Sequence, residues 1–218
     1  MHTKSQKTAQ RVGRIITYII LIFAAVICLF PFLWMVSTSF KETSEIYKMP
    51  PDLIPTNPTV QNYIEGWKGA DFGLFFKNSL FITIIATVGT VLSSAFVAYG
   101  FARFKARFSG LLFTILLATM MLPTQVTLIP QYLMFNKLGM INTYFPLLIP
   151  SWLGGGAFNI FLFIQFFRTL PKELDEAAKI DGANSFQIFT KIMLPAVKPV
   201  MLAVLVMSLV YNWNDFFS

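Results

Sequence analysis

The stretch IITYIILIFAAVICLFPFLWMV occupies residues 15–36 and contains no charged side chain. A helix needs about 20 apolar residues to cross the roughly 30 Å hydrocarbon layer of a bilayer. The whole chain is similarly apolar, since 56% of its 218 residues are hydrophobic and only 12% are charged, against about 25% charged in soluble domains. This stretch therefore predicts an integral membrane protein. Its spans are expected to be helical, because continuous apolar runs differ from the alternating pattern of a membrane β-barrel.

Three further apolar runs meet the same length requirement, and a fourth, the last in the chain, is short. The expected spans lie at 15–36, 76–101, 111–130, 144–167 and 199–211. The predicted fold is an all-α, polytopic transmembrane helix bundle, with a cytoplasmic N-terminal segment at 1–14 and a transmembrane domain at 15–218. The first span is expected to be an uncleaved anchor, because it is longer than the apolar core of a typical secretory signal.

The distribution of positive charge predicts the orientation of the spans. With a cytoplasmic N-terminus, 12 of the 17 Lys and Arg residues lie on the cytoplasmic side, and such an excess is typical of that side. The net charge of +7 then comes mostly from Lys and Arg residues that flank the spans and meet membrane lipid. The sequence does not predict nucleic-acid binding, because it has no basic cluster interleaved with aromatic residues. The outer connector, 37–75, is expected to form turns and a short helix around 61–67.

The cytoplasmic connector, 168–198, carries the most specific motif of the chain. Glu176-Ala177-Ala178 is followed after three residues by Gly182, and nine residues later by Ile192-x-Leu194-Pro195. Pro171 suits the first position of a short helix, and Gly182 provides a left-handed residue to end it.

A second helix is expected in this connector after Asn184 or Ser185 as N-cap, ending before Pro195. Its bundle-facing side is expected to carry Phe186, Phe189, Ile192 and Met193. The small alanines permit close approach by another protein, and Glu176 offers it a charge. The connector therefore predicts docking of a soluble partner, with the following contact residues: Glu176, Ala177, Ala178, Asp181, Gly182, Ile192, Leu194 and Pro195.

This helix–glycine–helix pattern resembles the signature loop of ABC importer permeases. Other short patterns resemble the maltose-type carbohydrate branch of that family, in particular its smaller maltose permease subunit. They include Pro31-Phe32-Leu33-Trp34-Met35, Tyr99-Gly100-Phe101-Ala102-Arg103, Leu138-Gly139-Met140-Ile141-Asn142-Thr143 and Trp213-Asn214.

The resemblance implies a permease subunit of an ATP-driven carbohydrate importer in the bacterial plasma (inner) membrane. Such a subunit forms half of the translocation pathway with a second homologous permease subunit, and an extracytoplasmic sugar-binding protein delivers the substrate. The loop around Glu176 and Gly182 would dock ABC ATPase subunits. Members of the family have six spans, so the five present here predict a chain truncated before the last transmembrane helix, and a non-functional truncated permease is one alternative.

The chain contains no Gly-x-x-x-x-Gly-Lys-Ser/Thr loop, so ATP and Mg²⁺ are expected on a partner ATPase subunit. We expect this chain to be a transport subunit that is not an enzyme, with no bound cofactor and no catalytic residue. Cys28 and His2 are its only Cys and His, which leaves no ligand set for a Cys/His metal site.

Several polar residues in or near the spans are candidates for the translocation pathway. Pro123 is expected to kink the third span and free backbone groups there. Substrate-facing and structural roles both fit these candidates, which are Thr124, Gln125, Tyr132, Asn159 and Asn212. A stripe of small residues in the second span is expected to serve close helix packing, and it consists of Ala86, Thr90, Ser94 and Ala98.

Two other classes of function compete with the carbohydrate permease. The first is a permease of a non-sugar ABC importer, for a polyamine or a peptide. The second is a membrane enzyme or channel, which the sequence disfavours. An enzyme would need ionisable groups inside the spans, and a self-contained channel would not need the docking connector.

Overall fold

The computed structural model describes residues 4–215, and all its regular secondary structure within that range is helical. This confirms the predicted all-α fold. The chain divides into two compact units, residues 1–75 and 76–218.

The described part of the first unit, residues 4–75, contains the helices α1 (Lys4–Ser39), α2 (Thr43–Ile46) and α3 (Gln61–Gly69). Most apolar side chains of α1 between Val12 and Val36 are exposed, as expected for a helix that lipid surrounds. Helix α3 confirms the short helix expected near 61–67.

The connector after α1 is ordered by hydrogen bonds to its own backbone. The Lys41 ammonium is almost fully buried, donates to the Asp52 carbonyl and lies 4.8 Å from the centre of the Trp34 ring. The Asn62 amide donates to the carbonyls of Ser39, at 3.0 Å, and Lys41, at 2.7 Å. These contacts hold α3 against the C-terminal end of α1.

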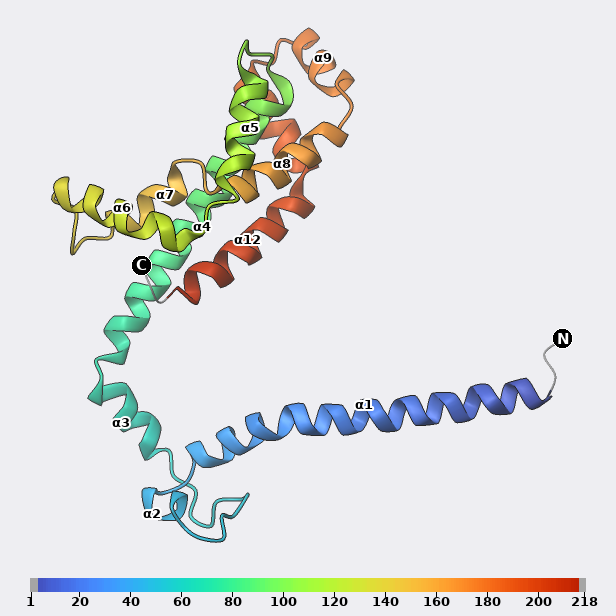
Figure 1. Cartoon of the computed structure of the whole chain (residues 1–218), viewed down its shortest axis with the longest axis vertical. Helices are drawn as coiled ribbons and strands as arrows, with labels where there is room; N and C mark the ends of the chain where they lie inside the picture. Colours follow the sequence, from blue (N-terminus) through green and yellow to red (C-terminus); the bar gives the residue numbers. More distant parts are fainter. Residues whose placement is uncertain (1–3, 216–218) are drawn as a thin grey trace. The chain divides into compact units, whose positions relative to one another are not determined.

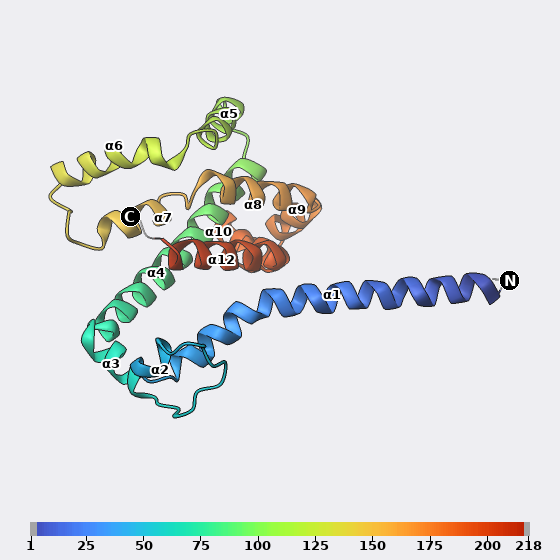
Figure 2. The same ribbon diagram turned by 60° about the horizontal axis from the view of Figure 1, so that its bottom comes forward.

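The second unit is built around the long helix α4 (Phe72–Arg103), which enters it at residue 76. Helices α8 (Ala157–Thr169) and α12 (Lys198–Trp213) lie alongside α4 in both ribbon views (Figures 1 and 2). The apolar core they share includes Val91, Ala95, Ala98, Ile160, Phe163, Ile164, Phe167, Val200 and Val204.

The small residues of α4 allow another part of the chain to approach its backbone closely. Ala86, Thr90, Ser94 and Ala98 are all buried, which confirms that this stripe serves packing. Gly155 sits against it, with φ +64°, and a Cβ at Gly155 would lie 2.5 Å from the Thr90 carbonyl oxygen.

The remaining apolar runs are interrupted. Helix α5 (Ser109–Thr119) is followed by α6 (Thr124–Lys137) at an angle of 103°. Helix α7 (Phe145–Trp152) is separated from α8 by Gly154, Gly155 and Gly156, which all have positive φ. Within residues 4–215, three helical segments are long and apolar enough to cross a membrane: Gln10–Ser39, Phe72–Arg103 and, with α7 and α8 taken together, Phe145–Thr169. Counting each bent pair as one span raises the number to as many as five.

The third expected span, 111–130, is therefore not one kinked helix. Its helix ends at Thr119, and a new one starts after Pro123. Proline removes a backbone donor and disfavours helical geometry in the preceding residue, which explains a complete break at this point.

Candidate functional site

The connector between α8 and α12 folds into a compact element, residues 170–197, which we call the docking element. It contains α9 (Glu173–Ile180), α10 (Ser185–Ile188), the π-helix η1 (Phe189–Met193) and α11 (Leu194–Ala196). It lies at the end of the second unit where α4 terminates (Figure 1).

Helix α9 ends as its sequence predicted. Gly182 has φ +82°, and the following N–H, of Ala183, donates to the Ala178 carbonyl at 2.9 Å. A left-handed glycine satisfies the last carbonyls of a helix in this way. The start differs from the expectation, because Pro171 precedes the helix and Lys172 is its N-cap.

Helix α10 begins with a capping box. The Asn184 side chain accepts a hydrogen bond from the Gln187 N–H, and the Gln187 side chain accepts one from the Asn184 N–H, each at 2.9 Å. Asn184 as N-cap is thus confirmed. The expected stop before Pro195 is wrong, because Pro195 lies within α11.

The expected buried side of this second segment is confirmed at Phe189 and Met193, with Ile192 half-buried against the core, but it is wrong at Phe186. Ile188, Phe189 and Met193 are buried, whereas Phe186 is 66% exposed. The expectation assumed regular α-helical spacing, but a π-helix has more residues per turn. Ile188 and Met193, five residues apart across this π-helix, are both fully buried, so Ile188 joins the buried side that regular spacing did not assign to it.

The eight residues assigned to docking separate into two groups in the structure. Ala178 is buried, and Ile192 and Leu194 are half-buried against the apolar core. The other five are exposed: Glu176, Ala177, Asp181, Gly182 and Pro195.

A buried ion pair that the sequence had not predicted joins α9 to the end of α4. Arg103 Nε lies 2.7 Å from Asp175 Oδ2, and the two side chains are only 7% and 11% exposed. Arg103 Nη2 also donates to the Leu170 carbonyl at 3.0 Å. One signal in the sequence could have indicated this pair. Asp175 lies three residues before Ala178, on the same helix face, so a face that is buried at Ala178 also buries the Asp175 carboxylate. A buried carboxylate requires a partner.

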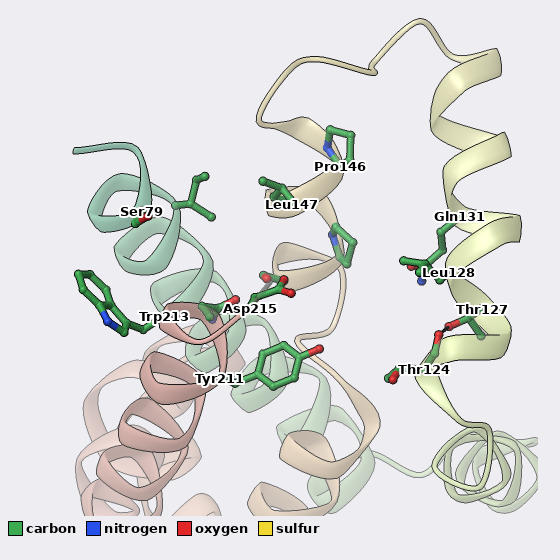
Figure 3. A pocket seen from close by; sticks show the side chains of 14 residues that line it. Ser79, Thr124, Thr127, Leu128, Gln131, Pro146, Leu147, Tyr211, Trp213 and Asp215 are labelled. Atoms are coloured by element: carbon green, nitrogen blue, oxygen red, sulfur yellow. Dashed lines mark hydrogen bonds between the residues drawn. The ribbon is translucent and has the colours of Figure 1, made fainter. Parts of the chain in front are cut away.

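A polar pocket of about 350 Å³ lies elsewhere in the second unit. Residues from α4, α6, α7 and α12 surround it, and Figure 3 shows Tyr211 and Asp215 extending toward the space beside α6. Its polar lining residues are Ser79, Thr124, Thr127, Gln131, Ser151, Tyr211, Asn212 and Asp215. Among the residues that the structure places around this space, Asp215 is the only charged one.

Two of the five predicted pathway residues, Thr124 and Asn212, line this pocket. Gln125 and Tyr132 are exposed and do not line it, and the Asn159 amide donates to the Gly155 carbonyl at 2.7 Å. Asn212 also bonds within its own helix, to the Ser208 carbonyl at 2.8 Å.

The contribution of α6 to the pocket was only partly predicted. Thr124, Thr127 and Gln131 follow one another at spacings of three and four residues, which place them on one helix face. This periodicity was readable from the sequence once a helix was assumed to begin after Pro123. In the described residues, 4–215, no three His, Cys, Asp or Glu side chains form a group that could hold a metal ion.

The chain is similar to known transport proteins over most of its length. Residues 91–218 match the family described as binding-protein-dependent transport system inner membrane component. The chain is 33% identical to the diacetylchitobiose uptake system permease protein NgcG of Streptomyces coelicolor, covering 92% of this chain and 66% of that protein. It is 31% identical to the lactose transport system permease protein LacG of Rhizobium radiobacter, covering 95% and 74%.

Similarity extends to a transporter of another solute and to a solved structure. The chain is 34% identical to the sn-glycerol-3-phosphate transport system permease protein UgpE of Yersinia enterocolitica, covering 93% of this chain and 73% of that protein. A bacterial ABC transporter involved in the import of the acidic polysaccharide alginate contains a chain of the same fold, with a TM-score of 0.86 at 24% identity, covering 100% of this chain and 75% of that one.

Proposed function

We propose that this chain, which belongs to the family of binding-protein-dependent transport system inner membrane components, is the permease subunit of an ATP-driven carbohydrate importer. The observation that carries the proposal is the docking element. A short helix that ends at the left-handed Gly182 presents Glu176 and Ala177 to solvent, while Ala178 and Asp175 secure its opposite face.

In this proposal the exposed face of α9 binds an ABC ATPase subunit, which holds ATP and Mg²⁺. The five exposed residues make the contact, namely Glu176, Ala177, Asp181, Gly182 and Pro195. Ala178, Ile192 and Leu194 anchor the docking element in the apolar core. Closure of the ATPase subunits displaces α9. The helices attached to α9 then switch the pathway from inward-open to outward-open. Two distinct sites are then coupled through one element with two positions.

The polar pocket is the part of the pathway that this chain contributes. Its hydroxyl, amide and carboxylate groups can accept and donate hydrogen bonds to sugar hydroxyls, and two relatives are named for diacetylchitobiose and lactose uptake. A second homologous permease completes the pathway, and an extracytoplasmic sugar-binding protein delivers the substrate. The N-terminus lies in the cytoplasm, as the distribution of Lys and Arg indicates.

A polyamine importer is the second candidate. The single observation that favours it is that Asp215 lines the pocket, because a carboxylate suits an amine. The same charge disfavours an anionic substrate.

The test is uptake by the complete importer reconstituted in vesicles that contain ATP. Labelled lactose and diacetylchitobiose are expected to enter, and unlabelled spermidine is expected not to compete with them. Combining Glu176→Lys with Gly182→Pro should abolish uptake while the chain still inserts in the membrane. Transport that is unaffected by this double change would refute docking through α9, and uptake of spermidine alone would favour the polyamine importer.

A further inference from the structure

We propose that the Arg103–Asp175 ion pair is a clamp that passes movement of the docking helix α9 directly to α4. Arg103 and Asp175 are positioning residues in this scheme, since neither is assigned a contact with substrate or nucleotide. The inference rests on the proposed function of α9 as the ATPase docking helix.

The ion pair is the main polar connection between α9 and the rest of the second unit. The 2.7 Å contact between Nε and Oδ2 is nearly excluded from solvent, so water screens it little. Arg103 also donates to the Leu170 carbonyl, at 3.0 Å, where α8 ends. One guanidinium therefore holds the end of α8 and the first turn of α9 to the last turn of α4.

Apolar packing alone gives α9 little attachment. The only buried residues of this eight-residue helix are Asp175 and Ala178, and Ala178 contributes a single methyl group. A helix this short is marginal without tertiary contacts. The position of α9 on the bundle therefore depends strongly on the ion pair.

Helix α4 is the unbroken route from the docking element to the polar pocket. It runs without interruption from Phe72 to Arg103, and Ser79 and Ile82 on the same helix line the pocket. At 1.5 Å per residue, Arg103 and Ser79 lie about 36 Å apart along the helix axis.

The other two routes are interrupted. Helix α8 is separated from the pocket-lining helix α7 by Gly154, Gly155 and Gly156, all with positive φ. The segment Ser185–Ala196 meets α12 at an angle of 80°. A displacement of α9 therefore reaches the pocket most directly through Arg103 and α4, because this route contains no break or bend.

The experiment uses the importer assembled with its ATPase subunits, and its readout needs no transported solute. Cys28, the only native cysteine, is replaced by Ser, and Ser79→Cys is introduced as a reporter in the pocket. The labelling rate of residue 79 by a membrane-impermeant maleimide is compared between nucleotide-free complex and complex trapped with ATP and vanadate. With the native ion pair, the two labelling rates are expected to differ by a factor of roughly five or more. A factor of about five is the lower end of the coupling strengths that are common between two sites in a protein.

Three variants test the clamp in this background. Asp175→Asn is expected to bring the ratio toward unity while ATP hydrolysis continues. The exchanged pair, Arg103→Asp with Asp175→Arg, is expected to restore most of the ratio, which a purely structural disruption would not do. Asp52→Asn is the matched control: it removes the exposed ion pair with Lys48, also 2.7 Å long, and is expected to leave the ratio unchanged.

The outcomes separate this inference from the proposed function. A native complex that holds no ATPase subunit, or whose Glu176→Cys variant forms no crosslink to one, refutes docking itself. A complex that forms this crosslink, yet keeps the full labelling ratio with Asp175→Asn, overturns only the clamp. If Asp175→Asn fails to assemble, the apolar pair Arg103→Met with Asp175→Leu replaces it, since such replacement of buried ions is often tolerated. Loss of the ratio in that pair supports the clamp, and retention overturns it.

Discussion

The contact between Gly155 and α4 predicts that Gly155→Ala destabilises the second unit. The added Cβ would lie 2.5 Å from the Thr90 carbonyl oxygen and 2.8 Å from its Cα. Both are backbone atoms of a helix that is packed on other sides, so neither can move without disturbing the core. The φ of +64° at Gly155 adds a second penalty for any residue with a Cβ.

The two penalties can be assigned magnitudes. Left-handed geometry costs about 1–2 kcal/mol for a residue other than glycine, and forced overpacking costs about 1–3 kcal/mol more. The expected loss in free energy of unfolding is therefore about 2–5 kcal/mol. Gly139 provides a matched control, since its φ is +68° and a Cβ added there would meet no other atom within 4 Å. Gly139→Ala should show only the first penalty, about 1–2 kcal/mol.

The assay is equilibrium unfolding of the purified chain in mixed micelles by a denaturing detergent, followed by tryptophan fluorescence. Trp152 lies near the affected contact, because a Cβ at Gly89 of α4 would sit 2.5 Å from its ring. Equal destabilisation by Gly155→Ala and Gly139→Ala would show that the close approach to Thr90 contributes nothing. The packing explanation of the small-residue stripe would then be refuted.

Three further results are expected from smaller changes. Asn184→Ala removes the capping box with Gln187 and should lower the stability of the docking element by about 1 kcal/mol, measured as faster amide exchange over 185–188; unchanged exchange would contradict the capping role. Ser93→Ala removes the 2.8 Å hydrogen bond to the Ser151 carbonyl and should cost about 0.5–1.5 kcal/mol in the same detergent titration, whereas a neutral result would mean that this bond does not hold α7 to α4. Gln131→Ala should raise the KM for sugar uptake by roughly tenfold at most, the value of one hydrogen bond, with ATP hydrolysis intact. A normal KM would remove Gln131 from the pathway.

Local features of the docking element were predictable from sequence because they depend on neighbouring residues. The left-handed Gly182 and the Asn184 cap act within one turn of the chain, so their effect follows from residue type and spacing alone. The start of α9 and the buried side of α10 were predicted less well. The π-helix at Phe189–Met193 leaves no signal in a residue pattern that assumes regular helical spacing.

The residues that line the pocket were also only partly predictable from local sequence. The spacing of Thr124, Thr127 and Gln131 marks a polar helix face, but the break at Pro123 that turns α6 by 103° is needed to present that face to α12. Asn159 was a reasonable candidate as a polar group in a span, yet its hydrogen bond to Gly155 satisfies it locally. Residue type alone does not distinguish these two situations.

Composition and local spacing were enough to establish an all-helical membrane protein with a capped connector motif, because transfer into lipid and helix termination are properties of single segments. The packed helices were needed to bring Arg103 to Asp175, to enclose one pocket between four helices, and to make α4 the unbroken connection between the two places. These are relations between segments distant in the chain. Their energies depend on burial and geometry, which arise only when the helices pack.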